Sequence, residues 1–232
     1  MAQMTMPVEP IIPVASSHDR ILASAKRLFA SQGYEATSTM AIARLAGTSE
    51  SQMMKHFGSK EGLLEAILDE GWKSMGSALK DVIAMPDSAA KLIAMLDVVL
   101  KTLSDDPDLK ELYLLEGRRI RREGRHVVLS PGYIDFVKLV DDVLKKMAAS
   151  GQLRPGISSD AVRSAIMGMA EGMMRDQVLA RRRGEFTADY TDHDFKAVYV
   201  ACLEGMTSAP KSPERSRPKV KAKPRPKSRR RG

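Results

Sequence analysis

Cysteine is almost absent from this sequence, since Cys202 is the only one. A single cysteine forms no disulfide within the chain, which is typical of proteins kept in a reducing cytoplasm. Its neighbours Val198, Tyr199 and Leu203 favour a small, buried, apolar side chain for Cys202, and a redox-sensing thiol is the alternative.

Long apolar runs and a secretory signal are also missing. No stretch is long enough to span a bilayer. Residues 1–15 contain three prolines and no basic start before an apolar run, so they predict a flexible leader rather than a signal peptide. The expected location is the cytoplasm, in association with the nucleoid.

The residue types that carry catalysis are scattered. The four histidines, His18, His56, His126 and His193, lack the spacing of metal ligands with acids or with Cys202. The sequence has neither a glycine-rich phosphate loop nor a nucleophile motif. We therefore predict no metal site, no cofactor and no enzyme activity. An enzyme is the second class of function, which a mutant phenotype without any link to DNA would favour.

Positive charge is concentrated at one end of the chain. The net charge is +8, but the segment after Pro210 holds eleven Lys and Arg against Glu214 alone, a net +10. The remaining 1–210 therefore carry −2, so the body is nearly neutral. Residues 209–232 are rich in proline and cations with almost nothing apolar, and predict a disordered basic tail. Non-specific attraction to nucleic acid is its expected role, and a solubilising extension is the alternative.

Apolar residues recur at helical spacing along the chain, and no alternating strand pattern of useful length occurs. The predicted fold class is all-α. Residues 16–60 are expected to form an N-terminal three-helix helix-turn-helix DNA-binding domain. Residues 61–208 are expected to form a helical C-terminal domain for regulation, ligand binding and dimerisation. One helix, from Ser59 to about Ala84, is expected to leave the first domain and enter the second.

Residues 37–60 predict two short helices joined by a tight turn. Gly47 supplies the turn conformation that other residues resist. Ser49 opens the second helix, with Gln52 placed to complete a capping box. Met53 is expected to face inward. A short helix held across another through a glycine turn is the helix-turn-helix geometry, whose second helix enters the DNA major groove.

The residues around this stretch carry a resemblance to a known family. They are Arg20-Ile21-Leu22, Ala25, Leu28-Phe29, Gly33-Tyr34, Ala36-Thr37-Ser38, Ile42-Ala43, Ala46-Gly47, Ser49, His56-Phe57 and Ser59-Lys60-Glu61-x-Leu63-Leu64. On these residues the chain resembles the TetR/AcrR family of bacterial transcriptional regulators, over its amino-terminal DNA-binding domain. It departs from the family at Ser51, where relatives usually carry glycine. It departs again at Met54, where they carry an aromatic residue that often touches the DNA backbone.

The DNA-facing residues follow from the second short helix. If Met53 and Phe57 face inward, Gln52 and Lys55 point outward, where Gln52 suits bidentate pairing with adenine and Lys55 suits guanine or phosphate. The predicted DNA-binding set is Thr39, Glu50, Ser51, Gln52, Met54, Lys55, His56 and Lys60. Within it, the resemblance implies backbone contacts for Thr39, Lys55, His56 and Lys60. Simple solvation is the alternative for Gln52 and Lys55.

The second domain is rich in methionine on one long predicted helix, beside Gly168 and Gly172. A plastic apolar ligand cavity is one interpretation, and core or subunit packing is the other. The candidate ligand-binding residues are Leu96, Leu100, Leu112, Val140, Leu144, Met169 and Met173. The resemblance implies a homodimer through residues 159–182 and 192–207.

These observations predict a ligand-responsive, homodimeric repressor that binds a palindromic operator on double-stranded DNA. Its ligand is expected to be small and largely apolar. An activator or a ligand-independent regulator is the alternative among site-specific regulators. A nucleoid-type protein that binds DNA mainly through its basic tail is the alternative of another class, and uniform coating of DNA would favour it.

The tail interpretation makes a prediction about salt dependence. Deleting residues 210–232 is expected to leave folding and operator choice intact and to lower affinity for operator and random DNA together. Each neutralised phosphate adds about −0.9 to the slope of log K against log salt concentration. If about four tail cations engage per chain, the intact protein is steeper by roughly 3 to 4 units per chain, as measured by binding titrations over a salt series. Parallel slopes for the two proteins would favour the solubilising extension.

Overall fold

The computed structural model describes residues 16–116, 130–183 and 188–207. Within these ranges the chain is helical, with a single isolated β-bridge between Leu153 and Thr207, so the all-α prediction is confirmed. The helices are α1 (Ser17–Gln32), α2 (Thr39–Leu45), α3 (Glu50–Phe57), α4 (Lys60–Ala78), α5 (Lys80–Ile83), α6 (Ala89–Asp105), α7 (Pro107–Leu115), α8 (Pro131–Ala149), α9 (Ser159–Arg183) and α10 (Asp192–Met206). The predicted leader and basic tail lie outside the described residues.

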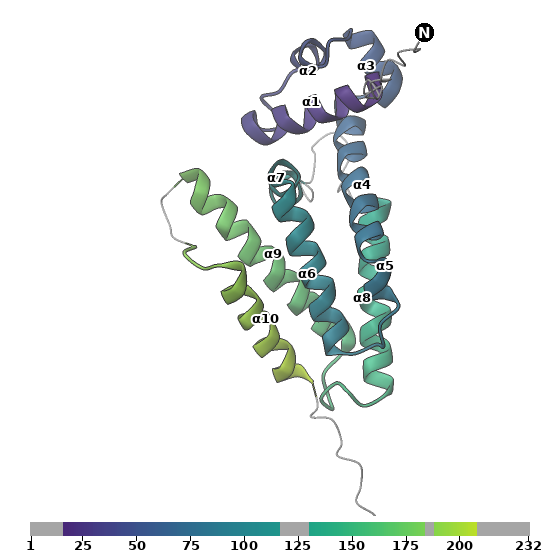
Figure 1. Ribbon diagram of the computed structural model, residues 1–232, viewed down its shortest axis with the longest axis vertical. Helices are drawn as coiled ribbons and strands as arrows, with labels where there is room; N and C mark the ends of the chain where they lie inside the picture. Colours follow the sequence, from purple (N-terminus) through teal and green to yellow (C-terminus); the bar gives the residue numbers. More distant parts are fainter. Residues whose placement is uncertain (1–15, 117–129, 184–187, 208–232) are drawn as a thin grey trace, which may run out of the picture.

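Helices α1, α2 and α3 form a small bundle at one end of an elongated molecule (Figure 1). Ser16 and Asp19 close a capping box at the start of α1, as their spacing predicts. The apolar stripe of α1 then packs against α2, α3 and the first turns of α4, and Phe29, Ile42 and Met53 are fully or almost fully buried. This packing completes the three-helix core that was predicted from the sequence.

Helix α4 belongs to both ends of the molecule. It begins at its cap, Ser59, beside α1 and α3, and runs down the length of the second helical layer (Figure 1). The expected single helix to Ala84 is interrupted at Leu79, although hydrogen bonds continue from Leu79 to Met75 and from Ile83 to Leu79, each of 2.9 Å. Because α4 crosses the predicted boundary at residues 60 and 61, the division into domains stays a prediction.

The second layer consists of α4 and α6 to α10. Helix α8 starts at Ser130, whose side chain caps it, with Pro131 in the first turn. Its Gly132 lies against α4 so closely that a Cβ atom there would be 2.4 Å from Trp72 Cβ. At the far end, the buried Lys91 ammonium donates to the carbonyls of Ile83 and Met85 and to the Asp87 carboxylate. The bond to Ile83 supplies a partner for the last carbonyl of α5.

Cys202 is exposed, so the expectation of a buried thiol was wrong. The inward face of α10 is formed by Phe195, Tyr199 and Leu203, which recur every four residues. Cys202 stands one position before Leu203 and therefore points about 100° away from that face. Apolar neighbours in sequence were a poor guide, since adjacent helical residues face different directions.

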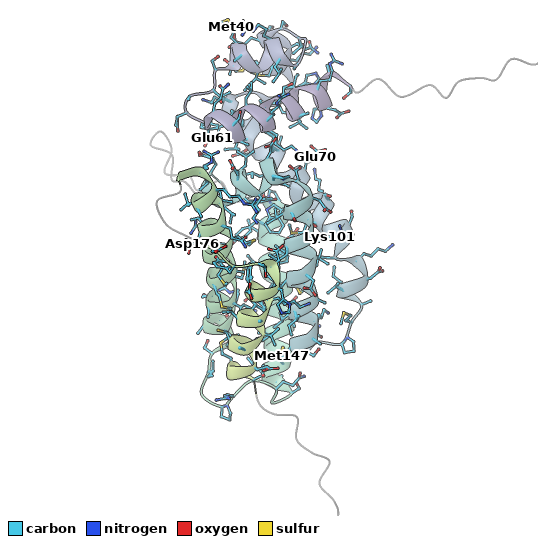
Figure 2. All side chains as sticks on the ribbon, turned by 60° about the vertical axis from the view of Figure 1, so that its left-hand side comes forward. Met40, Glu61, Glu70, Lys101, Met147 and Asp176 are labelled. Atoms are coloured by element: carbon cyan, nitrogen blue, oxygen red, sulfur yellow. The ribbon has the colours of Figure 1, made fainter. Side chains whose placement is uncertain are left out.

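The two ends of the molecule contact each other chiefly through α1 and α7. Lys26 of α1 forms an ion pair with Asp106, the residue that caps α7. Met40 of α2 and Met147 of α8 lie near opposite ends of the long axis (Figure 2). Among the described helices, none is both long enough and apolar enough to cross a membrane.

Candidate nucleic-acid interface and ligand cavity

The turn between α2 and α3 is formed by Ala46, Gly47 and Thr48. Gly47 adopts φ of 64°, a conformation that favours glycine, and the amide of Thr48 donates back to the Ala43 carbonyl over 3.0 Å. Arg20 of α1 donates through Nε to the Ala46 carbonyl over 3.1 Å. This hydrogen bond ties the turn to α1, a role that was not predicted for Arg20.

Burial of Met53 sets the rotation of α3 about its axis. The exposed residues of this helix include Glu50, Ser51, Lys55 and His56. Met54 is 39% exposed, which is a large accessible area for an apolar side chain. Gln52 and Phe57 are half-buried. The outward surface of α3 therefore presents polar hydrogen-bonding groups together with one flexible apolar side chain.

Several predicted DNA-binding residues contact each other in the free protein. The Thr39 hydroxyl donates to the Glu50 carboxylate, which joins the starts of α2 and α3. The Gln52 amide nitrogen and Ser17 Oγ each lie 3.2 Å from His56 Nε2. Gln52 was expected to complete a capping box with Ser49, but its side chain instead lies against His56. Its backbone amide still donates to the Ser49 hydroxyl, so the cap itself is present.

Lys60 occupies the first position of α4. Its ammonium group is 3.4 Å from the Glu35 carbonyl and 4.3 Å from the centre of the Tyr34 ring. These contacts hold the cation beside the amino end of α4, where backbone amides also favour a phosphate. The structure thus gathers the eight predicted residues on the α2–α3 end and the adjoining start of α4.

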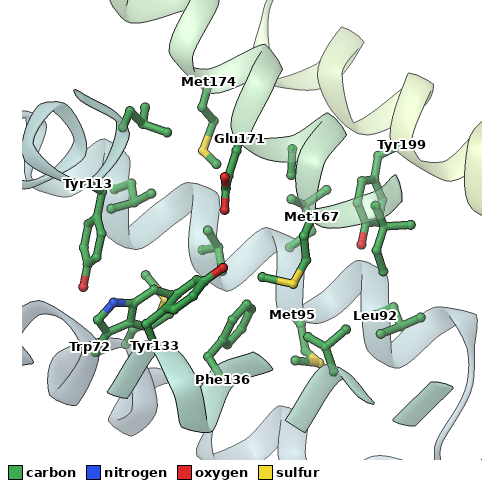
Figure 3. A pocket seen from close by; sticks show the side chains of 18 of the residues that line it. Trp72, Leu92, Met95, Tyr113, Tyr133, Phe136, Met167, Glu171, Met174 and Tyr199 are labelled. Carbon is green, nitrogen blue, oxygen red and sulfur yellow. The ribbon is translucent and has the colours of Figure 1, made fainter. Parts of the chain in front are cut away.

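An apolar cavity of about 110 Å³ lies inside the second layer, between α4, α6, α7, α8, α9 and α10. Aromatic rings form one wall: Trp72 lies 5.1 Å from both Tyr113 and Phe136 and 5.4 Å from Tyr133, between ring centres. Met95, Met167 and Met174 contribute flexible sulfur-containing side chains, and the Glu171 carboxylate points into the same space (Figure 3). Enclosed apolar cavities with few polar groups are typical of small-molecule sites.

The seven predicted ligand-binding residues have two different placements. Leu96 and Val140 line the cavity. The other five lie outside the cavity wall: Leu100, Leu112 and Leu144 are buried in the core, and Met169 and Met173 are half-buried. On α9 the wall is formed by Met167 and Met174, which are seven residues apart and share a face, whereas Met169 and Met173 are rotated away from it. The aromatic wall was missed because Trp72, Tyr113 and Phe136 come from three helices.

Two phenols in the cavity wall are neutral at physiological pH. Burial raises the pKa of Tyr113 and of Tyr199 well above the ordinary value for tyrosine. The Tyr113 hydroxyl donates to the Leu68 carbonyl of α4 over 2.7 Å. These side chains therefore offer the cavity apolar surface and hydroxyl groups rather than phenolate anions.

A second, larger void of about 730 Å³ lies between α1, α4, α6 and α7. Charged groups at its edge include Lys26, Lys101, Asp105 and Glu70. Because charged residues are more numerous in its lining, the smaller apolar cavity is the better candidate for the site of an apolar ligand. Among the described residues, no group of three or more His, Cys, Asp or Glu is placed to hold a metal ion.

These features define a class of protein: a helix-turn-helix bundle joined through α4 to a helical layer with an internal apolar cavity. Comparisons with known proteins agree. Residues 21–67 match the family described as bacterial regulatory proteins, tetR family. The uncharacterized HTH-type transcriptional regulator YvkB of Bacillus subtilis (strain 168) is 29% identical over 140 residues, covering 60% of this chain and 72% of that protein.

Two further similar proteins are matched over most of their own length. The HTH-type transcriptional repressor Rv1474c of Mycobacterium tuberculosis (strain ATCC 25618 / H37Rv) is 27% identical over 161 residues, covering 60% of this chain and 86% of that protein. The crystal structure of FadR from Bacillus subtilis in complex with stearoyl-CoA matches with a TM-score of 0.66 at 19% identity, covering 79% of this chain and 96% of that chain. The match to the TetR family thus covers residues 21–67, and the two relatives named above are transcriptional regulators.

The interface geometry predicts different roles for Lys60 and Gln52. Lys60→Ala is expected to weaken binding to all DNA sequences alike, because its ammonium lies at a helix amino terminus, a position that favours a phosphate. Gln52→Ala is expected to change which base is preferred, since an amide on α3 suits pairing with a base edge when this helix enters the major groove. Selection of binding sites from randomised DNA with each variant measures both effects. An unchanged base preference for Gln52→Ala would remove Gln52 from the set of base-reading residues.

Proposed function

We propose that this protein is a ligand-responsive, homodimeric transcriptional repressor that binds a palindromic operator. The observation that carries the proposal is that α4 takes part in both the helix-turn-helix core and the cavity wall. Its first turns pack in the helix-turn-helix core through Leu63 and Leu64, and its later turns line the cavity through Leu68, Trp72 and Met75. A ligand that alters the cavity therefore acts on an element that also carries the DNA-binding end.

The operator part of the proposal is supported by the exposed face of α3. Helix α3 has exposed polar residues and lies at the end of the molecule opposite the carboxyl ends of α8 and α10 (Figure 1). Two such faces related by a two-fold axis match two half-sites about one helical turn apart. Occupation of a promoter by this dimer blocks transcription, and the name of Rv1474c describes a repressor.

The dimer part of the proposal is supported by the outer surfaces of α9 and α10. A Cβ atom added at Gly168, Gly172 or Gly205 would meet no atom of this chain within 4 Å. Val198 is 46% exposed, and Cys202 is exposed on the same helix as Val198. Small residues beside exposed apolar ones allow helices of a second copy to approach closely.

The ligand is proposed to be a small molecule with a largely apolar body. The aromatic and methionine wall recognises such a body by burial of apolar surface. The cavity of about 110 Å³ is small for a long hydrocarbon chain, so a larger ligand requires the methionine side chains to rearrange. FadR of Bacillus subtilis was solved with stearoyl-CoA, and long-chain acyl-CoAs are therefore the first compounds to test.

The dimer is tested with a glycine on the proposed interface. Gly168→Arg is expected to give monomers and to abolish operator binding, because it places a long cation where a second copy would pack. Gly76→Arg is the matched control, since Gly76 of α4 also has open space around its Cβ position but lies outside α9 and α10. Sedimentation and operator binding assays measure both variants. A dimer that survives Gly168→Arg would remove this surface from the interface.

The ligand site is tested with a natural reporter, since Trp72 is the only tryptophan of the chain and lines the cavity. Acyl-CoAs of increasing chain length are expected to change the Trp72 emission in a saturable manner and to release operator DNA over the same concentrations. Ala170→Phe is expected to abolish both responses while operator binding persists, because Ala170 lines the cavity and the new ring fills it. An unchanged emission with release of DNA would place the ligand elsewhere.

A further inference from the structure

The last turn of α1 is completed by a side chain from the other end of the sequence. The final carbonyls of a helix lack partners within it. In α1, the Phe29 carbonyl accepts from the Gly33 amide over 3.0 Å, and the Leu28 carbonyl accepts from the Thr37 hydroxyl over 3.2 Å. The Ala30 carbonyl accepts from the guanidinium of Arg182, which belongs to α9. A cation at this position is also favoured by the helix dipole.

The same guanidinium is held by α7. Arg182 donates through Nε and Nη2 to one carboxylate oxygen of Glu111, with Nε at 3.1 Å. This contact raises the pKa of Arg182 further above its already high value. Because an arginine head group is planar and carries several donors, it can bridge two acceptors in a defined orientation. Arg182 thus joins α1, α7 and α9 at one point, and we call this group the Arg182 clamp.

The rest of α9 connects the Arg182 clamp to the cavity. Ile166, Met167, Ala170 and Met174 of α9 line the cavity. One position further on, Arg175 donates through Nε to the Leu114 carbonyl of α7 over 3.2 Å. A shift of α9 at the cavity therefore moves the carboxyl-terminal part of α9 along with its contacts to α7.

Helix α7 is fixed to α9 at a further point between these arginines. The buried Lys110 ammonium donates to the Gln177 side-chain oxygen over 3.2 Å, and the Gln177 amide donates to the Tyr190 carbonyl over 3.3 Å. A displacement of this part of α9 is therefore expected to displace α7 as well. The Arg182 clamp adds the direct bond from α9 to α1, beyond the indirect path through α7.

A second polar contact between α1 and the second layer has a different origin. Lys26 pairs with Asp106, at the junction of α6 and α7. The Arg182 clamp instead involves α9, which is one of the two helices of the proposed dimer interface. Its position is therefore suited to set the direction in which each DNA-binding end projects from the dimer core.

We propose that Arg182 is the positioning residue that sets the orientation of the α1–α3 bundle relative to α9 and α10, and that a ligand in the cavity acts on DNA binding by loosening this clamp. The second half of this statement rests on the function proposed above. The first half depends only on the contacts of one chain, so the two can fail separately.

The orientation is measured as a distance between two spin labels in one chain. Both labels are placed in a Cys202→Ser chain. Met40→Cys puts one label on α2, where Met40 is 68% exposed, and Ile157→Cys puts the other beside the start of α9, where Ile157 is 37% exposed. Co-expression with a differently tagged Cys202→Ser chain and purification through both tags give dimers with only one labelled chain. Double electron–electron resonance then reports the distance between the two ends of that chain, and a monomer can be measured in the same way.

Arg182→Ala is compared with Arg181→Ala, which removes the same charge from the adjacent, exposed position. We expect Arg182→Ala to shift or broaden the distance distribution and Arg181→Ala to leave it as in the parent protein. Glu111→Gln keeps an acceptor for Arg182 but removes the negative charge. Its distance distribution is expected to lie between those of Arg182→Ala and Arg181→Ala. Identical distributions for Arg182→Ala and Arg181→Ala, with both variants folded by circular dichroism, would overturn the proposal.

A second readout separates orientation from general damage. A changed spacing of two recognition helices affects a palindromic operator selected from random DNA, but not random DNA itself. Arg182→Ala is therefore expected to lower the ratio of operator to random affinity by about tenfold, within the range typical of coupling between sites. Equal losses for both kinds of DNA would overturn the positioning role. If the parent protein itself selects no operator, the proposed function fails, while the distance measurement still decides whether Arg182 holds α1.

Discussion

The apolar face of α4 is buried in two different cores, and this constraint organises the rest of the structure. Leu63 and Leu64 complete the packing of α1 to α3, while Leu68, Trp72 and Met75 form part of the cavity wall. The backbone hydrogen bonds of a continuous helix resist bending between these two regions. In the proposed function, a change in the cavity is therefore transmitted to the small bundle through α4.

Polar contacts between the two ends have a role that burial cannot supply. Apolar packing is non-directional and tolerates sliding, whereas hydrogen bonds have defined lengths and angles. The pairs Lys26–Asp106 and Arg182–Glu111 are partly exposed, so each contributes little to the free energy of folding. Their value lies in the orientation of α1, which rests on α7 between the small bundle and the second layer (Figure 1).

The surface of α2 and α3 that is proposed to face DNA is preorganised through contacts among its own polar residues. Thr39 is engaged by Glu50, and His56 lies between Ser17 and Gln52. Selectivity of such a surface depends more on the placement of donors and acceptors than on net charge, because phosphate contacts position a protein whereas base contacts specify its sequence.

The sequence by itself determined the all-α class, the helix starts at Ser16, Ser49 and Ser130, and the inward position of Met53, because caps and helical periodicity are local properties. The helix-turn-helix and its surface followed from the same local signals. Only the tertiary structure decided which buried residues face the cavity, since that depends on how neighbouring helices are rotated against each other. It alone also brought Arg182 to Ala30, because a contact across 152 residues leaves no local pattern.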